Sequence, residues 1–349
     1  MKLEVSIQKK LRAFTLDASF TVENEVFALL GASGCGKSMT LKCIAGLETP
    51  DNGRIALNGR VLYDRAQGIN LPPQKRHIGY LFQDFALFPN MTIAENIAFA
   101  ARGTKEEKNQ LVEENLRRFG LTEQRGARPA ELSGGQQQRA ALARILASDA
   151  ELLLLDEPFS ALDSYLRWQL ELELRDVLKQ YEGTALFVSH DRGEVYRLAD
   201  RAGVIDRGRL QSVQETRQLF AAPGTVAATV LTGCKNISHA QKKGAQLIYA
   251  SDWNLPLHTA AIVPDEVSAA AIRAHFLEAR SFADEADNTF PMEILQVIED
   301  TFSIILMTRP LGTDARPIRW EIQKATWAEL KGRPLYLHFP PDKIMLLSE

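Results

Sequence analysis

The sequence predicts an α/β domain followed by a smaller β-rich domain. Apolar runs at residues 26–30, 151–156 and 185–189 read as buried strands, and each ends at a glycine loop or at polar residues, which is typical of a parallel α/β sheet. From about residue 233, short alternating segments separated by Gly, Pro and Asp indicate a β-rich unit. A chain of 349 residues exceeds one compact core, so we expect at least two domains.

The composition excludes several classes of protein. Hydrophobic residues make up 45% and charged residues 24%, as in a globular protein. No run approaches the roughly 20 apolar residues of a spanning helix, and the start lacks the apolar segment of a signal peptide, so we expect a cytoplasmic location. A net charge of −3 predicts no nucleic-acid partner. The 3 cysteines, which show no CxxC spacing, argue against a disulfide framework or a zinc site.

The first apolar strand leads into a glycine-rich loop, GASGCGKS, which matches the pattern G-x-x-x-x-G-K-[ST]. The glycines let backbone N–H groups point at a β-phosphate, Lys37 can span the β- and γ-phosphates, and the Ser38 hydroxyl can coordinate Mg²⁺. Cys35 is either an oxidisable thiol or a small packing residue, and we favour packing. The predicted nucleotide-binding residues are Gly31, Ala32, Ser33, Gly34, Cys35, Gly36, Lys37, Ser38 and Met39.

Three further segments place polar residues where strands end. The run LLLLDEP ends in Asp156, which can hold Mg²⁺, and Glu157, which can polarise an attacking water. The strand at 185–189 delivers His190, either as a γ-phosphate contact or as a structural residue. Gln83 in YLFQD follows another apolar strand and can reach Mg²⁺ or the water, unless it is a solvated loop residue.

The stretch ELSGGQQQRA precedes an alanine-rich helix at 140–147. Ser133, Gly134 and Gly135 therefore lie at a helix start, where free backbone N–H groups and the positive end of the helix dipole suit a phosphate. The alternative is an ordinary N-cap, with Ser133 capping and the glycines serving the turn.

Taken in order, GASGCGKS, YLFQD, LSGGQQQR, LLLLDEP, SALD and SH resemble the motifs of the ATP-binding cassette (ABC) family over about residues 1–225. The resemblance implies a P-loop ATPase with a RecA-like core, a helical subdomain at about 84–145, and ATP and Mg²⁺ as cofactors. It also implies a homodimer in which the signature residues Ser133, Gly134, Gly135 and Gln136 complete the ATP site of the facing chain.

The same resemblance assigns roles to single residues. It makes Glu157 the catalytic base, His190 the γ-phosphate switch, Gln83 the link between Mg²⁺ and the helical subdomain, and Asp163 of SALD the communication between the two sites. Magnesium would be held by Ser38, Gln83 and Asp156.

Partners and departures from the family follow from the resemblance as well. The helical subdomain usually receives a coupling helix of a membrane permease, and Phe85, Phe88 and Met91 could supply apolar surface for it or serve as core. Met39 stands where the family usually carries Ser or Thr, and Met39 cannot hydrogen-bond the α-phosphate. Only Phe14 is available to stack on adenine.

The C-terminal part resembles that of importer ATPases. An apolar strand pattern resumes after Pro223-Gly224, and residues 226–349 are expected to form an OB-like barrel of the TOBE or Mop type. Such a barrel would either regulate import or only mediate dimerisation. We expect a peripheral protein at the cytoplasmic face of the membrane that works with permease subunits and, indirectly, with a solute-binding protein.

The solute is indicated less directly. The stretch at 53–84, together with TGCKNIS and AIRAHF, resembles the molybdate and sulfate importer branch, so we expect an oxyanion and in particular molybdate. Importers of sulfate or thiosulfate, iron(III), polyamines or sugars are the alternatives. A non-transport cassette ATPase is more distant, because the chain shows neither a heptad run between its two nucleotide motifs nor a second P-loop.

Overall fold

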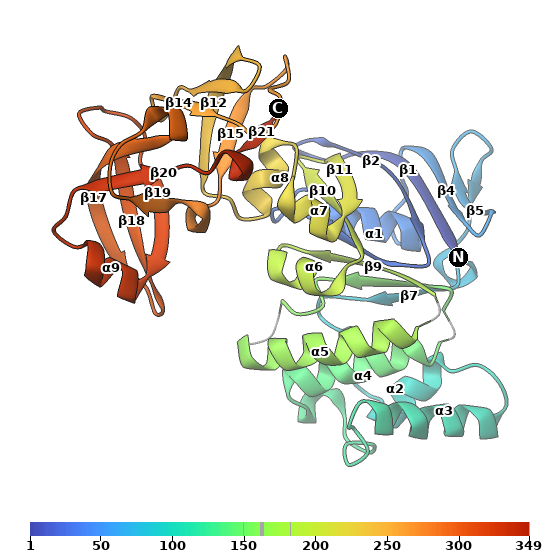
Figure 1. Ribbon diagram of the computed structural model, residues 1–349. Helices are drawn as coiled ribbons and strands as arrows, with labels where there is room; N and C mark the ends of the chain where they lie inside the picture. Colours follow the sequence, from blue (N-terminus) through green and yellow to red (C-terminus); the bar gives the residue numbers. More distant parts are fainter. Residues whose placement is uncertain (149, 161–163, 182, 349) are drawn as a thin grey trace. The chain divides into compact units, whose positions relative to one another are not determined.

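The computed structural model describes residues 1–148, 150–160, 164–181 and 183–348. The chain divides into two compact units, Met1–Arg217 and Gln218–Glu349 (Figure 1). The boundary therefore follows Arg217, whereas the sequence motifs suggest a boundary after residue 225. Among the described residues, no helix is both long enough and apolar enough to cross a membrane.

A mixed sheet forms the centre of the first unit, with strand order β6-β5-β4-β1-β2-β11-β10-β3-β9-β8-β7 (Figure 1). Neighbours from β10 to β7 are parallel, whereas β1, β2, β4, β5 and β6 pair in antiparallel fashion. The strands are β1 Lys2–Lys10, β2 Thr15–Glu23, β3 Val26–Leu30, β4 Asn52–Leu57, β5 Arg60–Asp64, β6 Ile69–Asn70, β7 Ile78–Leu81, β8 Leu152–Asp156, β9 Thr184–Ser189, β10 Arg201–Asp206 and β11 Arg209–Glu215.

The strand register explains why the polar motifs meet. Strands β8 and β9 are buried along their whole length, as their continuous apolar runs predict for parallel strands covered on both faces. Leu30 pairs with Ser189, Val188 pairs with Asp156, and Leu155 pairs with Leu81. The carboxyl ends of β3, β9, β8 and β7 therefore lie level with one another at a single edge of the sheet.

The helices of the first unit begin at recognisable caps. Thr92, Thr104 and Ser133 each accept a hydrogen bond from the backbone three residues later and so start α2, α3 and α4 with capping boxes. Helices α2, α3 and α4 contact one another, and α4 also contacts β7. The helices are α1 Lys37–Ala45, α2 Ile93–Ala100, α3 Lys105–Arg118, α4 Gly134–Leu146, α5 Ser164–Gln180 and α6 Arg192–Leu198, and α7 Thr216–Ala221 spans the boundary between the units.

Arg76 closes the carboxyl end of α1. Its side chain is 0% exposed, and its guanidinium donates to the carbonyls of Cys43 at 2.9 Å, Ile44 at 2.7 Å and Leu71 at 2.8 Å. Two of these acceptors, the carbonyls of Cys43 and Ile44, belong to the last turn of α1, where carbonyls lack partners within the helix ladder. Arg76 thus anchors the end of α1 that is remote from the glycine-rich loop.

The second unit is β-rich, which confirms the fold class expected for this part of the chain. Its strands form two antiparallel sheets, β14-β13-β12-β15-β21 and β16-β20-β17-β18-β19, whose side chains share one core cluster containing Ile248, Leu306 and Trp320. The strands are β12 Asn236–Gly244, β13 Leu247–Ala250, β14 Leu255–His258, β15 Ala269–Ile272, β16 Glu278–Arg280, β17 Thr289–Glu299, β18 Ser303–Pro310, β19 Ile318–Gln323, β20 Leu335–His338 and β21 Met345–Leu347.

In the described part of the second unit, the α-helices are α8 Val226–Leu231 and α9 Lys324–Leu330. The expectation of an apolar strand directly after Pro223-Gly224 is therefore wrong. Thr225 accepts a hydrogen bond from the Ala228 N–H at 3.2 Å and starts α8 as its N-cap, so the local cap overrides the apolar run.

Candidate functional site

The glycine-rich loop lies between β3 and α1 and curls over the sheet edge. Gly34 and Gly36 adopt positive φ angles of 78° and 113°, a region that favours glycine. A Cβ on Gly31 would lie 2.5 Å from the Ile205 carbonyl oxygen, so a larger residue does not fit there. These backbone requirements explain the glycines of the motif, and such a loop can turn successive N–H groups toward an anion.

Lys37 is buried at the start of α1 and is 3% exposed. Its ammonium donates to the carbonyl oxygens of Gly31 at 2.8 Å and Ala32 at 3.0 Å, both within the loop. A buried ammonium held by neutral carbonyls retains an uncompensated charge, which favours a phosphate as its partner.

The side chains of Cys35 and Met39 face packing environments. Cys35 is 6% exposed, and burial raises the pKa of its thiol. This favours the packing role over that of an oxidisable thiol, because the thiolate is the reactive form. Met39 packs, partly buried, against the core cluster beneath the sheet.

Ser38 and Asp156 meet directly at the sheet edge. The Ser38 hydroxyl donates to Asp156 Oδ1 at 2.7 Å, and the Tyr80 hydroxyl donates to Asp156 Oδ2 at 2.9 Å. Asp156 is 5% exposed, so both oxygens of a buried carboxylate are held by hydroxyl groups.

Glu157 and His190 form the adjacent pair. His190 Nδ1 lies 3.3 Å from Glu157 Oε2, with side-chain exposures of 51% for His190 and 16% for Glu157. Glu157 has a φ of 45°, a conformation that non-glycine residues rarely adopt and that is often found at functional sites. The two residues directly follow β8 and β9, and the parallel register of these strands places them side by side.

Gln83 and the aromatic residues that follow it differ in how far they are exposed to solvent. Gln83 is exposed and takes no part in the hydrogen bonds that join Ser38, Tyr80 and Asp156. Phe85 is 6% exposed, which favours the core role among the two alternatives for this residue. Phe88, at 37% exposed, does reach the surface, where its ring contacts that of Phe99 at 4.7 Å.

The signature segment forms the N-terminus of α4. The Ser133 hydroxyl accepts from the Gln136 N–H at 3.3 Å, and Gln136 Oε1 accepts from the Ser133 N–H at 2.9 Å. Ser133 is therefore an N-cap, while Ser133 and Gly134 are exposed and Gly135 is buried. Asp163 of the SALD motif lies outside the described residues.

Phe14 lies beside the glycine-rich loop. It is the last residue before β2, and its Cε2 atom lies 3.5 Å from the position that a Cβ on Gly36 would take. Gly208 approaches the same ring so closely that a Cβ there would lie 2.3 Å from Phe14 Cδ2. An aromatic face next to the phosphate loop suits a nucleotide base.

Geometry and donor chemistry fit a nucleotide with a magnesium ion. Mg²⁺ prefers hard oxygen ligands and keeps several waters, and it is usually bound through one or two carboxylates together with phosphates. Ser38 and Asp156 supply such oxygens, and the described residues contain no group of three His, Cys, Asp or Glu that would form an all-protein metal cage.

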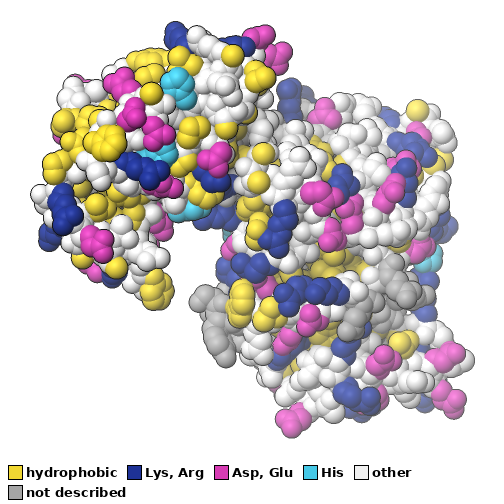
Figure 2. All heavy atoms as spheres, in the orientation of Figure 1, with side chains coloured by type: hydrophobic (Ala, Val, Ile, Leu, Met, Phe, Trp, Pro, Cys, Tyr) yellow, Lys and Arg dark blue, Asp and Glu magenta, His cyan; other side chains and the backbone are white. Residues whose placement is uncertain are grey.

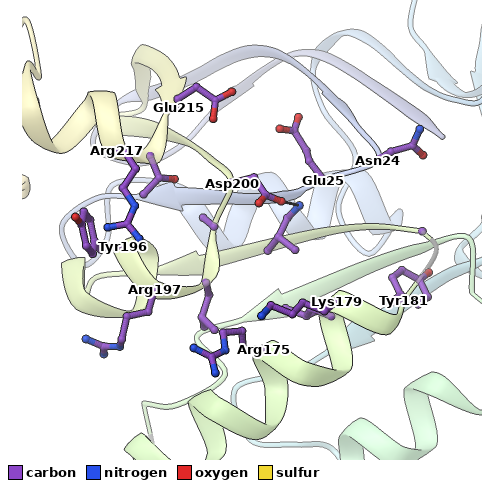
Figure 3. A pocket seen from close by; sticks show the side chains of 16 residues that line it. Asn24, Glu25, Arg175, Lys179, Tyr181, Tyr196, Arg197, Asp200, Glu215 and Arg217 are labelled. Atoms are coloured by element: carbon purple, nitrogen blue, oxygen red, sulfur yellow. Dashed lines mark hydrogen bonds between the residues drawn. The ribbon is translucent and has the colours of Figure 1, made fainter.

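A cavity of about 500 Å³ lies elsewhere in this unit (Figure 3). Val26 and Gly183, which line it, stand at the amino ends of β3 and β9, opposite the edge that carries Lys37 and Asp156. Figure 2 shows Lys and Arg side chains gathered over α5 and α6 on this face. Because α/β sheets place ligands at the carboxyl ends of their strands, this cavity is not the candidate nucleotide site.

Sequence patterns did not indicate the contacts of several residues in and around the site. Tyr80 carried only the signal of an aromatic hydroxyl on the strand beside the one that ends at Asp156. Glu194, which accepts from the Ser189 hydroxyl at 2.5 Å, carried the signal of an acidic residue four positions after the histidine. Arg144 on α4 donates to the carbonyls of Phe85 at 3.0 Å and Ala86 at 2.7 Å, a contact that no local pattern indicates.

The chain is similar to known ATP-binding proteins of transporters. The ABC transporter family profile matches residues 16–160. An iron(III) import ATP-binding protein of Haemophilus influenzae is 42% identical over 221 residues, which is 62% of this chain and 62% of the relative, so the match spans less than two thirds of that protein. A sulfate/thiosulfate import ATP-binding protein of Mannheimia succiniciproducens is 34% identical over 340 residues, covering 94% of this chain and 92% of the relative.

Among solved structures, the ATP-binding cassette MJ0796, described as a dimer in a post-hydrolysis state bound to ADP and Pi, superposes with a TM-score of 0.53 at 28% identity. The match covers 62% of this chain and 99% of that chain. This superposition supports a P-loop ATPase fold for the first unit. Motif order, site geometry and the 34% identity over 94% of the chain lead to one conclusion: the chain belongs to the ABC transporter family of ATP-binding proteins.

Proposed function

We propose that the chain is the ATP-hydrolysing subunit of an ABC importer. The observation that carries this proposal is the meeting of three groups at one sheet edge: the buried Lys37 ammonium, the Ser38–Asp156 pair and the Glu157–His190 pair. The similarity to import ATP-binding proteins of Haemophilus influenzae and Mannheimia succiniciproducens supports the same activity.

Each group has a defined task in hydrolysis. The loop N–H groups and Lys37 bind and orient the phosphates, and Phe14 offers a face for the adenine. A bound Mg²⁺ neutralises phosphate charge, and Ser38 and Asp156 are the residues that would hold it. Glu157 accepts the proton of the attacking water at its carboxylate, while His190, whose Nδ1 lies 3.3 Å from Glu157 Oε2, holds that carboxylate and would contact the γ-phosphate.

Glu157→Gln tests the proposal, because an amide keeps the shape of the side chain but cannot accept the proton. We expect ATP binding to persist and turnover to fall by about 10²- to 10⁴-fold. Glu106→Gln, an exposed position on α3, is the matched control. Turnover within a few-fold of the unmodified protein would remove Glu157 from the role of base.

The functional unit is a head-to-tail homodimer in this proposal. Ser133 and Gly134 are exposed at the start of α4, where N–H groups and the helix dipole can meet a phosphate held by a second chain. The dimeric MJ0796 structure with bound ADP and Pi supports the arrangement. Asp163 would carry communication between the two sites, and Gln83 would approach the magnesium only in the assembled state.

The membrane partner would contact the α2–α4 region. Phe88 and Phe99 expose 37% and 63% of their surface and contact each other, so they offer an apolar anchor for a permease segment. The protein would thus lie peripherally on the cytoplasmic face of the membrane, and a solute-binding protein would act through the permease.

The transported solute is proposed to be an oxyanion, with molybdate as the first candidate and sulfate or thiosulfate next. The sulfate/thiosulfate relative aligns over 94% of the chain, which must include most of the second unit, and this supports the oxyanion class. Iron(III) is the alternative to an oxyanion, because the iron relative has the higher identity, 42%, although over only 62% of the chain. Transport assays with radiolabelled molybdate, sulfate and iron(III) in the assembled transporter separate the three.

The second unit would sense the solute or mediate dimerisation. Its β17–β18 hairpin exposes Val297 at 45% and Phe302 at 88%, which suits a contact with another protein surface. ATPase rates of the full chain and of a chain cut near Val226 are compared in the assembled transporter while molybdate is titrated. Slowing confined to the full chain supports sensing; equal slowing, or none, leaves dimerisation as the role.

A further inference from the structure

The Asp156 carboxylate is held from two sides by residues of two different elements. Ser38 at the start of α1 donates to Oδ1 at 2.7 Å, and Tyr80 on β7 donates to Oδ2 at 2.9 Å. The first contact belongs to the nucleotide motifs. The second is used by none of the roles assigned above.

The position of Tyr80 follows from the parallel register of β7 and β8. Tyr80 pairs with Leu154, two residues before Asp156, so the side chains of Tyr80 and Asp156 lie on the same face of the sheet. Its hydroxyl meets the Asp156 carboxylate at the carboxyl end of β8. Its ring contacts that of Phe82 at 4.5 Å, so the ring has packing partners independent of the hydroxyl.

The environment keeps this hydrogen bond in one direction. Asp156 is 5% exposed, and Tyr80 is partly buried against the core cluster. An ionised carboxylate can only accept hydrogen bonds, so the Tyr80 hydroxyl is the donor in this contact. A carboxylate with little access to water depends on such donors to stay in one orientation.

We propose that Tyr80 is a positioning residue for magnesium: its hydroxyl holds Asp156 so that Oδ1 faces Ser38 and the incoming ion. The inference rests on the proposed function, since it concerns the metal that accompanies ATP. Without the hydroxyl, Asp156 Oδ2 loses its partner and the carboxylate can rotate away from Ser38. Partners that orient metal ligands typically change metal affinity by about 10- to 100-fold when removed.

The test is Tyr80→Phe in the full chain, with Tyr63→Phe as the matched control. The Tyr63 hydroxyl is also buried, donates to the Pro50 carbonyl at 2.6 Å and belongs to the same core cluster. Both variants remove one oxygen atom from a packed ring, and only Tyr80→Phe touches Asp156. Binding of a fluorescent ADP analogue is measured first in EDTA and then with increasing Mg²⁺.

We expect Tyr80→Phe to bind the analogue in EDTA within about twofold of the unmodified protein, while the Mg²⁺ concentration for half-maximal tightening rises by about tenfold. With Mn²⁺ in place of Mg²⁺, the electron paramagnetic resonance spectrum of the bound ion should change in Tyr80→Phe and stay the same in Tyr63→Phe. Neither readout depends on hydrolysis.

Three results overturn the inference. A Mg²⁺ requirement within twofold of the unmodified protein would show that the hydroxyl does not position the ligand. An equal change in Tyr63→Phe would assign the effect to general packing. If the unmodified chain binds no Mg²⁺–nucleotide at all, the proposed function fails and this inference fails with it. The first two results, by contrast, refute the role of Tyr80 and leave the proposed function intact.

Discussion

Glu194 offers a test of the electrostatics beside His190. Its carboxyl group is 4% exposed on α6, and burial raises its pKa to about 7. The Ser189 hydroxyl, at 2.5 Å, lowers the pKa, whereas Asp191 and Glu171 raise it and Arg167 lowers it. The folded chain binds this proton more tightly than the unfolded chain does. Protonated Glu194 therefore stabilises the fold at low pH, and this contribution to the free energy of unfolding is lost as the pH rises through about 7.

The magnitude follows from the two pKa values. An ordinary glutamate has a pKa near 4.3 and one pKa unit corresponds to about 1.4 kcal/mol, so the free energy of unfolding should fall by roughly 2.5 kcal/mol between about pH 5 and pH 8. Glu194→Gln keeps an acceptor for Ser189 but cannot ionise. This variant should therefore lack that part of the pH dependence and should be more stable than the unmodified protein at about pH 8.

Urea unfolding followed by circular dichroism at several pH values measures the effect. The relevant quantity is the difference between the unmodified protein and Glu194→Gln, because other groups titrate equally in both. Glu106→Gln, which removes an exposed carboxylate from α3, is the control and should parallel the unmodified protein. If the Glu194→Gln curve also parallels the unmodified protein across this range, Glu194 does not carry the proposed proton and the reasoning from burial is refuted.

Three further outcomes are expected. Arg76→Met should lower the free energy of unfolding by about 3 kcal/mol or more in urea denaturation, because the carbonyls of Cys43, Ile44 and Leu71 lose their buried donor; a loss below about 1 kcal/mol would contradict this. Ser133→Arg should abolish hydrolysis yet bind ATP, and mixing it with Lys37→Ala should restore part of the ATPase activity through one intact composite site; equal loss of ATP affinity in Ser133→Arg alone would instead place Ser133 in its own chain's site. The native thiols should resist a thiol-reactive dye at about pH 8, because all 3 cysteines are buried and burial raises the pKa of Cys43 to about 12. The urea-unfolded chain should react fully. Rapid labelling of the native chain would speak against this burial.

Local sequence patterns are enough to predict the chemistry of the candidate nucleotide site. A glycine loop needs positive φ angles at Gly34 and Gly36, and a lysine and a serine next to it define a phosphate cradle without reference to distant residues. Continuous apolar runs likewise predict β8 and β9, because strands buried on both faces need apolar side chains at every position. Such features depend on neighbours in the chain, so they can be read from spacing.

Tertiary structure decided which of these residues meet and which lie apart. Strand order places β9 between β3 and β8, and only that order brings His190 to Glu157. Arg144 of α4 binds the carbonyls of Phe85 and Ala86, a contact across 59 positions of sequence for the first of them. Tyr80 reaches Asp156 across 76 positions. Contacts of this kind depend on parallel register and helix packing, which many distant side chains set together, so no local pattern encodes them.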